Sequence, residues 1–330
     1  MNEGFFVTKE MRERLIDIIS EVVKGKELNL GLFFDKCILW WREDTWKCGP
    51  EVQVSFLRKV YGNPQEIKRL LNLPGKKFRE EITKNVRLSI PFEMIPLNAY
   101  KLYKERKDML LDRLEGMGFC IKYLPNNSSG LPLNWRLIIN LGAASVYETS
   151  LLFHRNYSIP YIPGSAVKGV TRHWAILKFA EKSKENPKMI DDALSQGKDL
   201  GISVENISFA DLIRIFGTQS KKGEVIFFDA LPIIEQEKDF IALDVMNVHY
   251  KLYYEASERE LKENKEKAPG DWHSPTPIFF LTVEKGTKFR FVLASKNENL
   301  IEKVKEMLEE ALENIGVGAK TSAGYGYFEV

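Results

Sequence analysis

The residues best suited to bind a ligand lie in a glycine-rich stretch near the end of the chain. This stretch combines a flexible main chain with cationic and hydroxyl donors at Gly316, Gly318, Lys320, Thr321, Ser322, Gly324 and Tyr325. Glycine lets a ligand approach the main chain, so the N–H groups of such a loop, with a lysine and two hydroxyls beside them, predict a phosphate-binding site. A connector that only turns a helix into a strand is the alternative that this stretch leaves open.

The spacing of these residues excludes two common nucleotide-binding motifs. A P-loop requires GxxxxGK[ST] between a strand and a helix, whereas Ala319 separates Gly318 from Lys320 and the expected order is helix, loop, strand. A dinucleotide fingerprint requires a third glycine where Thr321 stands. A nucleotide-dependent enzyme built on this loop is therefore disfavoured.

A second stretch predicts an anion site at the start of a helix. The pattern favours a helix over residues 165–182, with Gly164 before it and Ser165 as its candidate N-cap. Lys168 and Arg172 are four residues apart and would share one face of this helix. Free N–H groups and the positive end of the helix dipole attract anions. A helix start with solvated basic side chains is the alternative. If both stretches bind one RNA, we expect Lys168, Arg172 and Lys320 to converge on one surface.

Composition limits the classes of function that remain. The 330 residues carry 48 Lys and Arg against 46 Asp and Glu, a net charge of +2, so binding to nucleic acid would depend on a local basic surface. Three cysteines without CxxC spacing and four histidines predict neither a disulfide framework nor a metal site. The first residues do not resemble a signal peptide, and no apolar run approaches membrane-spanning length. We expect a cytoplasmic protein.

The order of expected elements predicts an α+β fold. A turn-rich segment at residues 125–132 is the candidate boundary between a mostly helical N-terminal region, residues 1–130, packed on the core, and a second domain, residues 131–330. After the boundary, alternation predicts a strand over 133–141, with Trp135, Leu137 and Ile139 on one face. Further strands are expected over 224–231, 243–250 and 325–330, a hairpin over 278–294, and helices over 209–216 and 299–314. With insertions removed, the order is β-α-β-β-α-β, a ferredoxin-like or RRM-like core.

Two further regions have less regular patterns. In the N-terminal region, helices are expected over residues 8–24, 64–71, 77–84 and 98–114. The aromatic and basic residues between 28 and 59 suit either base stacking or ordinary core packing. Residues 232–277 form an insertion with aromatic flanks and a Lys/Glu-rich middle, and we expect residues 255–271 to be exposed and mobile.

Taken together, these motifs resemble one known family. The two candidate anion sites are similar to motifs of the RAMP superfamily of CRISPR-associated proteins, the C-terminal one to its glycine-rich loop. Further stretches narrow the resemblance to the sixth-subunit family of the Cmr, or type III-B, effector complex: residues 142–149 with His154, and residues 228–232, 243–250 and 271–277. The resemblance covers about residues 133–330.

The resemblance implies a non-catalytic backbone subunit of an RNA-guided, RNA-targeting complex in antiviral defence. Its RNA partners would be the crRNA, near the 3′ end, and the target RNA, contacted by both candidate anion sites and by His154. Its protein partners would be the other RAMP backbone subunits and a small helical subunit. The insertion would be a thumb that lies across the guide–target duplex; a solvated loop with a few anchoring aromatic residues is the alternative. Cleavage in such complexes is attributed to another subunit, so we expect no catalytic residue and no cofactor. The alternative is a metal-independent RAMP endoribonuclease that processes CRISPR RNA with His154 or His173 as acid and base.

Overall fold

One central strand organises the body of the molecule. The computed structural model describes residues 97–126, 129–143, 149–234 and 240–330, together with Arg69, Glu81, Ser89 and Ile90. Strand β10 (Lys288–Ser295) pairs antiparallel with four strands: β2 (Cys120–Leu124) and β6 (Val225–Phe227) flank its second half, and β3 (Leu131–Pro132) and β7 (Leu231–Ile233) its first half. Strand β10 has partners on both sides and helices cover both faces of its sheet, so its side chains are almost entirely buried, as in Phe289, Phe291 and Leu293.

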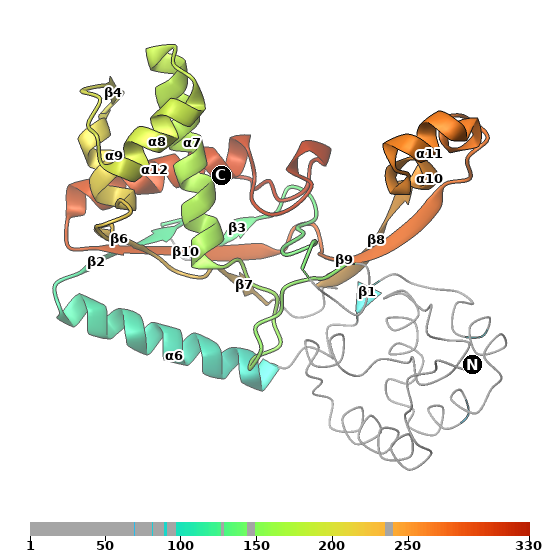
Figure 1. Cartoon of the computed structure of the whole chain (residues 1–330). Helices are drawn as coiled ribbons and strands as arrows, with labels where there is room; N and C mark the ends of the chain where they lie inside the picture. Colours follow the sequence, from blue (N-terminus) through green and yellow to red (C-terminus); the bar gives the residue numbers. More distant parts are fainter. Residues whose placement is uncertain are drawn as a thin grey trace.

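Helices cover both faces of this sheet (Figure 1). Helices α7 (Gly164–Ser183), α8 (Pro187–Gln196), α9 (Phe209–Phe216) and α12 (Glu298–Asn314) lie on one face, and α6 (Leu97–Gly116) lies along the other. A short ribbon of β4 (Ser203–Val204) and β5 (Ile207–Ser208) leads into α9. In α12 the buried residues recur at three- and four-residue intervals, as in Ile301, Val304 and Leu308, so one stripe of the helix packs into the core.

The predicted helices in this part of the chain are confirmed to within a few residues. Helix α9 has the predicted bounds because a capping box of Ser208 and Asp211 starts it and Gly217, with φ of 77°, follows it. The predicted N-cap of α7 is wrong. That helix starts at Gly164 after Pro163, whose side chain offers no acceptor, and a carboxylate from elsewhere in the chain accepts from the first N–H group instead.

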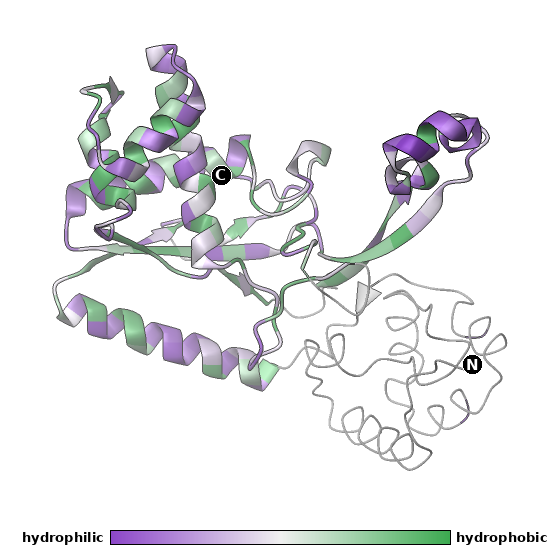
Figure 2. Cartoon of the chain, viewed as in Figure 1, coloured by the Kyte–Doolittle hydropathy of each residue, from purple (hydrophilic) through white to green (hydrophobic). Residues whose placement is uncertain are grey.

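A long hairpin projects from the body (Figure 1). Strands β8 (Ile241–Val248) and β9 (Thr276–Val283) pair along eight residues, and β1 (Ser89–Ile90) joins β8 at the base. The tip carries α10 (Lys251–Glu255), α11 (Glu258–Glu263) and the 3₁₀ turn η2 (Lys265–Lys267). We call residues 241–283 the projecting hairpin. The predicted exposure of its tip is confirmed and α11 is mostly hydrophilic (Figure 2), but the short helices were not predicted. The mobility of the tip stays a prediction.

The predicted hairpin over residues 278–294 is wrong. Strand β9 pairs with β8, whereas β10 pairs with β2, β3, β6 and β7, so residues 284–287 connect two sheets. The strand predicted over 224–231 also differs, because it is interrupted at residues 228–230 between β6 and β7.

The first and last strands of the predicted core are not regular strands. Residues 133–141 make only two isolated bridges, Leu133 to Phe328 and Leu137 to Val283. Their backbone groups bond instead to the C-terminal loop: Ala319 N donates to Ile138 O, and Gly326 N donates to Arg136 O. The α+β class is confirmed by the mixture of helices and sheets. The finer ferredoxin-like assignment stays a prediction.

Several other predictions fall outside the described residues. These are the helices over 8–24, 64–71 and 77–84, of which only Arg69 and Glu81 are described and are helical, and the aromatic segment over 28–59. Strand β2 precedes the turn-rich segment yet pairs with β10, and the division near residue 130 stays a prediction. Within the described ranges, no helix has the length and apolarity needed to cross a membrane. The same ranges hold no group of three acidic, histidine or cysteine side chains placed to bind a metal.

Candidate nucleic-acid interface

The C-terminal glycines allow two very close backbone approaches. A Cβ at Gly326 would lie 1.9 Å from Val317 O, and one at Gly318 would lie 2.3 Å from Ile138 O. Both residues also have positive φ, 78° and 100°, which favours glycine. These two glycines therefore fold the loop tightly onto residues 136–138, so part of the glycine signature has a structural cause.

The turn between them presents hydrogen-bond donors. Lys320, with φ of 58°, begins the 3₁₀ turn η3 (Thr321–Ala323), and Ser322 is exposed. Among the described residues, the N–H groups of Lys320, Thr321 and Ser322 have no acceptor, and neither hydroxyl is bonded. In the same part of the chain the Lys320 ammonium has no carboxylate partner; it lies 5.9 Å from the centre of the Phe280 ring of β9. This turn, residues 320–322, is called the Lys320 turn.

Tyr325 ties the Lys320 turn to the base of the projecting hairpin. Its hydroxyl donates to Asp244 Oδ2 at 2.8 Å, and Arg136 Nη1 donates to the same oxygen at 2.9 Å. Burial and the neighbouring carboxylate raise the pKa of Tyr325 to about 12. Burial alone would raise the pKa of Asp244, but the hydrogen bonds from Arg136 and Tyr325 lower it overall. At neutral pH the hydroxyl is therefore protonated and donates to an ionised Asp244.

The second predicted anion site is occupied by the chain's own groups. Gly164 N, the first N–H of α7, donates to Asp229 Oδ1 at 2.7 Å. Lys168 Nζ donates to Phe216 O at 2.8 Å, at the last residue of α9. Arg172 pairs with Asp191 of α8 and donates to Ser195 Oγ at 2.9 Å. Of the residues predicted here, Ser165 is exposed.

Helix α7, which carries Lys168 and Arg172, and the C-terminal loop, which carries Lys320, lie on the same side of the central sheet (Figure 1). Their side chains nevertheless contact different elements: Lys168 contacts α9, Arg172 contacts α8, and Lys320 lies over β9. The predicted convergence on one phosphate site, and the roles of these residues in RNA binding, stay predictions.

His154 lies in an aromatic cluster on the opposite side of the sheet. The loop that carries it reaches α6 (Figure 1), and its ring lies 4.7 Å from the rings of Tyr103 and Tyr157 and 5.4 Å from that of Tyr161. Its Nδ1 accepts from Asn156 N at 3.3 Å, and burial lowers its pKa although Asp229 opposes the shift. His173 is exposed on α7, beyond the sheet. The two histidines are therefore not placed to act as a pair.

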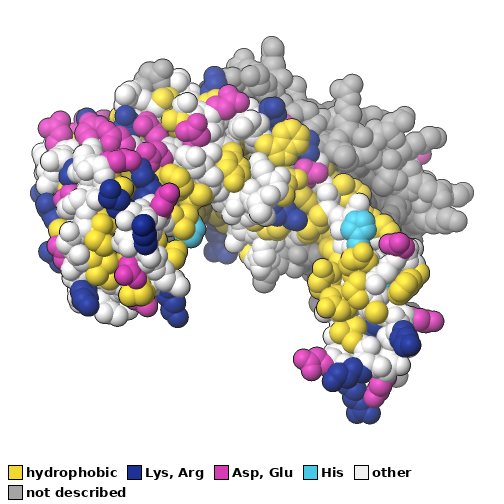
Figure 3. Space-filling model, turned by 90° about the horizontal axis from the view of Figure 1, so that it is seen from above, with side chains coloured by type: hydrophobic (Ala, Val, Ile, Leu, Met, Phe, Trp, Pro, Cys, Tyr) yellow, Lys and Arg dark blue, Asp and Glu magenta, His cyan; other side chains and the backbone are white. Residues whose placement is uncertain are grey.

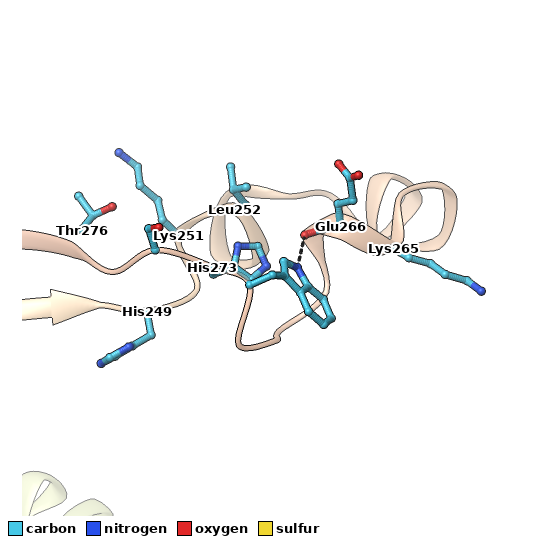
Figure 4. A pocket seen from close by; sticks show the side chains of 9 residues that line it. His249, Lys251, Leu252, Lys265, Glu266, His273 and Thr276 are labelled. Atoms are coloured by element: carbon cyan, nitrogen blue, oxygen red, sulfur yellow. Dashed lines mark hydrogen bonds between the residues drawn. The ribbon is translucent and has the colours of Figure 1, made fainter.

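The projecting hairpin bounds a hollow with the helical body. Seen from above (Figure 3), open space separates the hairpin from the helices. A second, smaller hollow on the hairpin itself is lined by His249, Lys251, Leu252, Lys265, Glu266, Trp272, His273, Ser274 and Thr276 (Figure 4). Trp272 is 66% exposed, and its Nε1 donates to Glu266 O at 3.1 Å, which fixes the orientation of the ring. Tyr254, 72% exposed, adds a further aromatic surface at the tip.

The region that contains these residues matches the model of a known protein family. The model of the RAMP superfamily matches residues 136–329. The chain belongs to the RAMP superfamily. Among RAMP proteins it is similar to the Cmr subunit Cmr6 of Pyrococcus furiosus, with 35% identity over 94% of this chain and 98% of that protein. It is also similar to the Cmr6 of Saccharolobus solfataricus, with 24% identity over 72% of this chain and 69% of that protein. The predicted resemblance is confirmed, and this is a Cmr6-like RAMP protein.

One solved structure is similar to this chain in its fold. A chain in the cryo-EM structure of the type III-B Cmr-beta complex bound to cognate target RNA matches this RAMP protein with a TM-score of 0.56 and 18% identity, over 96% of both chains. The described fold of this RAMP protein is therefore the fold of a chain within that complex.

The predicted orientation of Trp135 is wrong. Trp135 was predicted to share a strand face with Leu137 and Ile139, but those two are buried whereas Trp135 is 43% exposed. Without a regular strand, the alternation fails at this position. The sequence feature that could have indicated an exposed ring is that Trp135 is followed directly by Arg136, close to the predicted boundary.

Proposed function

We propose that this RAMP protein is a non-catalytic, RNA-binding backbone subunit of a type III-B CRISPR (Cmr) RNA-targeting complex. The observation that carries the proposal is the Lys320 turn, which presents three N–H groups, two hydroxyls and an ammonium beside the base of the projecting hairpin. The names of its relatives and the RNA-bound complex that contains a chain of the same fold support the proposal.

Main-chain donors and a lysine suit phosphate better than bases. Phosphate contacts fix the position of a nucleic acid without reading its sequence. In an RNA-guided complex, base pairing between the guide and the target supplies the specificity. We therefore assign the Lys320 turn to the crRNA backbone, on the side of the complex that holds the crRNA 3′ end. Other RAMP backbone subunits and a small helical subunit would be its neighbours. In this proposal the sheet and its helices are an elaborated ferredoxin-like core.

The projecting hairpin is assigned as the thumb of this subunit. It extends away from the body, and its tip exposes Trp272, Tyr254 and Leu252. Aromatic side chains that water reaches can stack on an unpaired base, with about 1–3 kcal/mol per base. The hollow between the hairpin and the helices is where a guide–target duplex would lie (Figure 3).

RNA binding through the Lys320 turn is tested by substitution of its lysine. We expect Lys320→Ala to weaken binding of a guide-sized RNA and to reduce the slope of log affinity against log salt by about 1, because one phosphate contact is lost. Lys188→Ala is the matched control, since Lys188 is an exposed lysine on α8. Equal salt slopes for wild type, Lys320→Ala and Lys188→Ala would contradict the proposed role of the turn.

His154 and His173 are the candidate acid and base of the endoribonuclease alternative. His154 Nδ1 already accepts a main-chain hydrogen bond, and His173 lies beyond the sheet. A general acid and base must both reach the reacting group. We expect guide-sized RNA to remain full length with the purified protein, with and without divalent metal. Specific cleavage that His154→Ala abolishes would favour the endoribonuclease alternative.

The thumb assignment is tested by shortening the tip. We expect replacement of residues 255–267 by a Gly/Ser linker to leave the fold intact, because none of these residues is buried. Assembly with other Cmr subunits or engagement of target RNA should weaken. A shortened protein that enters complexes and binds target RNA as the parent does would show that this segment is not the thumb.

A further inference from the structure

Trp135 is an exposed ring on the rigid part of the molecule. It is 43% exposed, yet the residues on either side of it are fixed. Asn134 N donates to Tyr327 O, and Leu137 bridges Val283 at the end of β9. An exposed tryptophan on a fixed main chain loses little conformational entropy when it binds a partner. The position therefore combines access from solvent with preorganisation.

Two cations flank the Trp135 ring. The guanidinium of Arg136 and the ammonium of Lys285 each lie 5.6 Å from its centre. Arg136 is held by Asp244, at 2.9 Å, and by Glu284, at 3.1 Å, so its charge is locally neutralised and its position is set. Lys285 is exposed, and its ammonium has no carboxylate partner among the described residues. Lys285 thus places over the ring a cation that a nucleic acid can reach.

The segment that carries Trp135 is connected to the Lys320 turn through Tyr325 and Phe280. The ring of Tyr325 lies 6.1 Å from that of Phe280, over which the Lys320 ammonium lies. Tyr325 and Arg136, the residue after Trp135, both donate to Asp244 Oδ2, at 2.8 Å and 2.9 Å. Gly326 N donates to Arg136 O, which joins the two segments through the main chain as well. The Lys320 turn and the segment that carries the exposed ring are therefore joined through side-chain contacts as well as through the main chain.

We infer that Trp135 is a stacking platform for a base of the RNA whose phosphate binds the Lys320 turn. This inference rests on the proposed function and adds a base-binding position to it. The ligand is a single-stranded nucleotide of any sequence, because every base has a face that stacks on an indole. Lys285, whose ammonium lies over the ring, would neutralise the adjacent phosphate. Stacking on an indole does not read the hydrogen-bonding edge of the base.

The test compares ligands that have the same charge with and without bases. The probes are a guide-sized RNA, the same RNA with abasic sites and inorganic polyphosphate. We expect Trp135→Ala to bind the intact RNA about 5- to 100-fold more weakly and Trp135→Phe to retain most of the affinity. The affinity for the abasic RNA and for polyphosphate should not change, nor should the salt slope. Met189→Ala is the control for loss of an exposed apolar side chain, since Met189 lies on α8.

The outcomes separate this inference from the proposed function. If Lys320→Ala changes the salt slope while Trp135→Ala binds intact RNA like wild type, the stacking role is wrong and the phosphate role stands. Equal losses by Trp135→Ala for RNA and for polyphosphate would also overturn stacking, because the effect would then be structural. Photocrosslinking of 5-bromouridine RNA to the wild-type protein covers the case in which Trp135→Ala does not fold. A crosslink at Trp135 supports the inference, and crosslinks only elsewhere overturn it.

Discussion

The two predicted anion sites are alike in composition and differ in what their groups contact. At the start of α7, the main-chain N–H of Gly164 and the side chains of Lys168 and Arg172 bind Asp229, Phe216 O and Asp191 within the chain. In the Lys320 turn, the corresponding donors have no acceptor among the described residues. A glycine, a hydroxyl and a lysine in sequence therefore do not identify a binding site. The decisive property is whether an acidic group or a helix end elsewhere in the chain already meets them.

The largest expected effect concerns the fold of the C-terminal loop. A Cβ at Gly326 would lie 1.9 Å from Val317 O, so the main chain must shift. We expect Gly326→Ala to reduce the free energy of unfolding by about 4 kcal/mol and to abolish RNA binding by the Lys320 turn. Gly324→Ala is the matched control, because Gly324 also has a positive φ, 90°, but no atom lies within 4 Å of its Cβ position. Urea unfolding of both variants measures the difference, and equal losses would show that contact with Val317 is unimportant.

The next prediction concerns the pH dependence of stability at Lys107, which lies beside the start of α7. Burial lowers the pKa of Lys107 to about 8, with a further contribution from Arg290, whereas Asp229 and Asp108 oppose the shift. Lys107 donates to Asp229 O, the main chain of the residue that binds Gly164. Between about pH 8 and 10.5 the unfolded chain binds more protons at this residue than the folded chain, so its contribution to stability rises with pH, by about 3 kcal/mol in all.

Comparison with Lys107→Met isolates this contribution from other groups that titrate. We expect the stability of wild type relative to Lys107→Met to increase from pH 7 to pH 10, measured by urea unfolding at each pH. A constant difference over this range would show that the folded Lys107 keeps its proton.

A smaller effect is expected at Arg172 of α7, where a substitution should reduce stability but leave RNA binding unchanged. Arg172 joins α7 to α8 through Asp191 and Ser195. Because Asp191 is partly exposed, we expect Arg172→Ala to cost only about 1–2 kcal/mol of stability. The salt dependence of RNA binding should stay as in wild type. A reduced salt slope with unchanged stability would mean that Arg172 binds phosphate after all and would remove the contrast between the two sites.

The smallest effect concerns one hydroxyl of the Lys320 turn. Ser322 is exposed and makes no hydrogen bond within the described chain. We expect Ser322→Ala to leave the unfolding free energy unchanged within about 0.5 kcal/mol and to weaken RNA binding by about 2- to 10-fold, as for one lost hydrogen bond. Ser220→Ala, at an exposed serine on the loop after α9, should change neither property. An RNA affinity equal to wild type would exclude Ser322 from the interface.

The sequence predicted helices better than strands, for a physical reason. Helix α9 is specified by neighbours in the chain, Ser208, Asp211 and Gly217. Strand pairing depends on distant partners, so the true partner of β9 could not be inferred from the turn that follows it. The same holds for the candidate sites. The composition of the Lys320 turn was visible in sequence, whereas the acids that occupy the α7 site lie at Asp229 and Asp191, outside the motif.

The central position of β10 has a consequence for how the chain folds during synthesis. Among the described elements, β2, β3, β6 and β7 all precede β10, and each pairs with it. The projecting hairpin, by contrast, pairs two strands that are joined through its own tip, and both are made before β10. On the ribosome the hairpin can therefore form first, while the four strands of the body lack their hydrogen-bond partner until β10 emerges. Such late, long-range pairing is slow and leaves unpaired edges exposed to other chains. We therefore expect a nascent chain that ends before Lys288 to form the hairpin without the central sheet and to expose unpaired strands to chaperones and proteases.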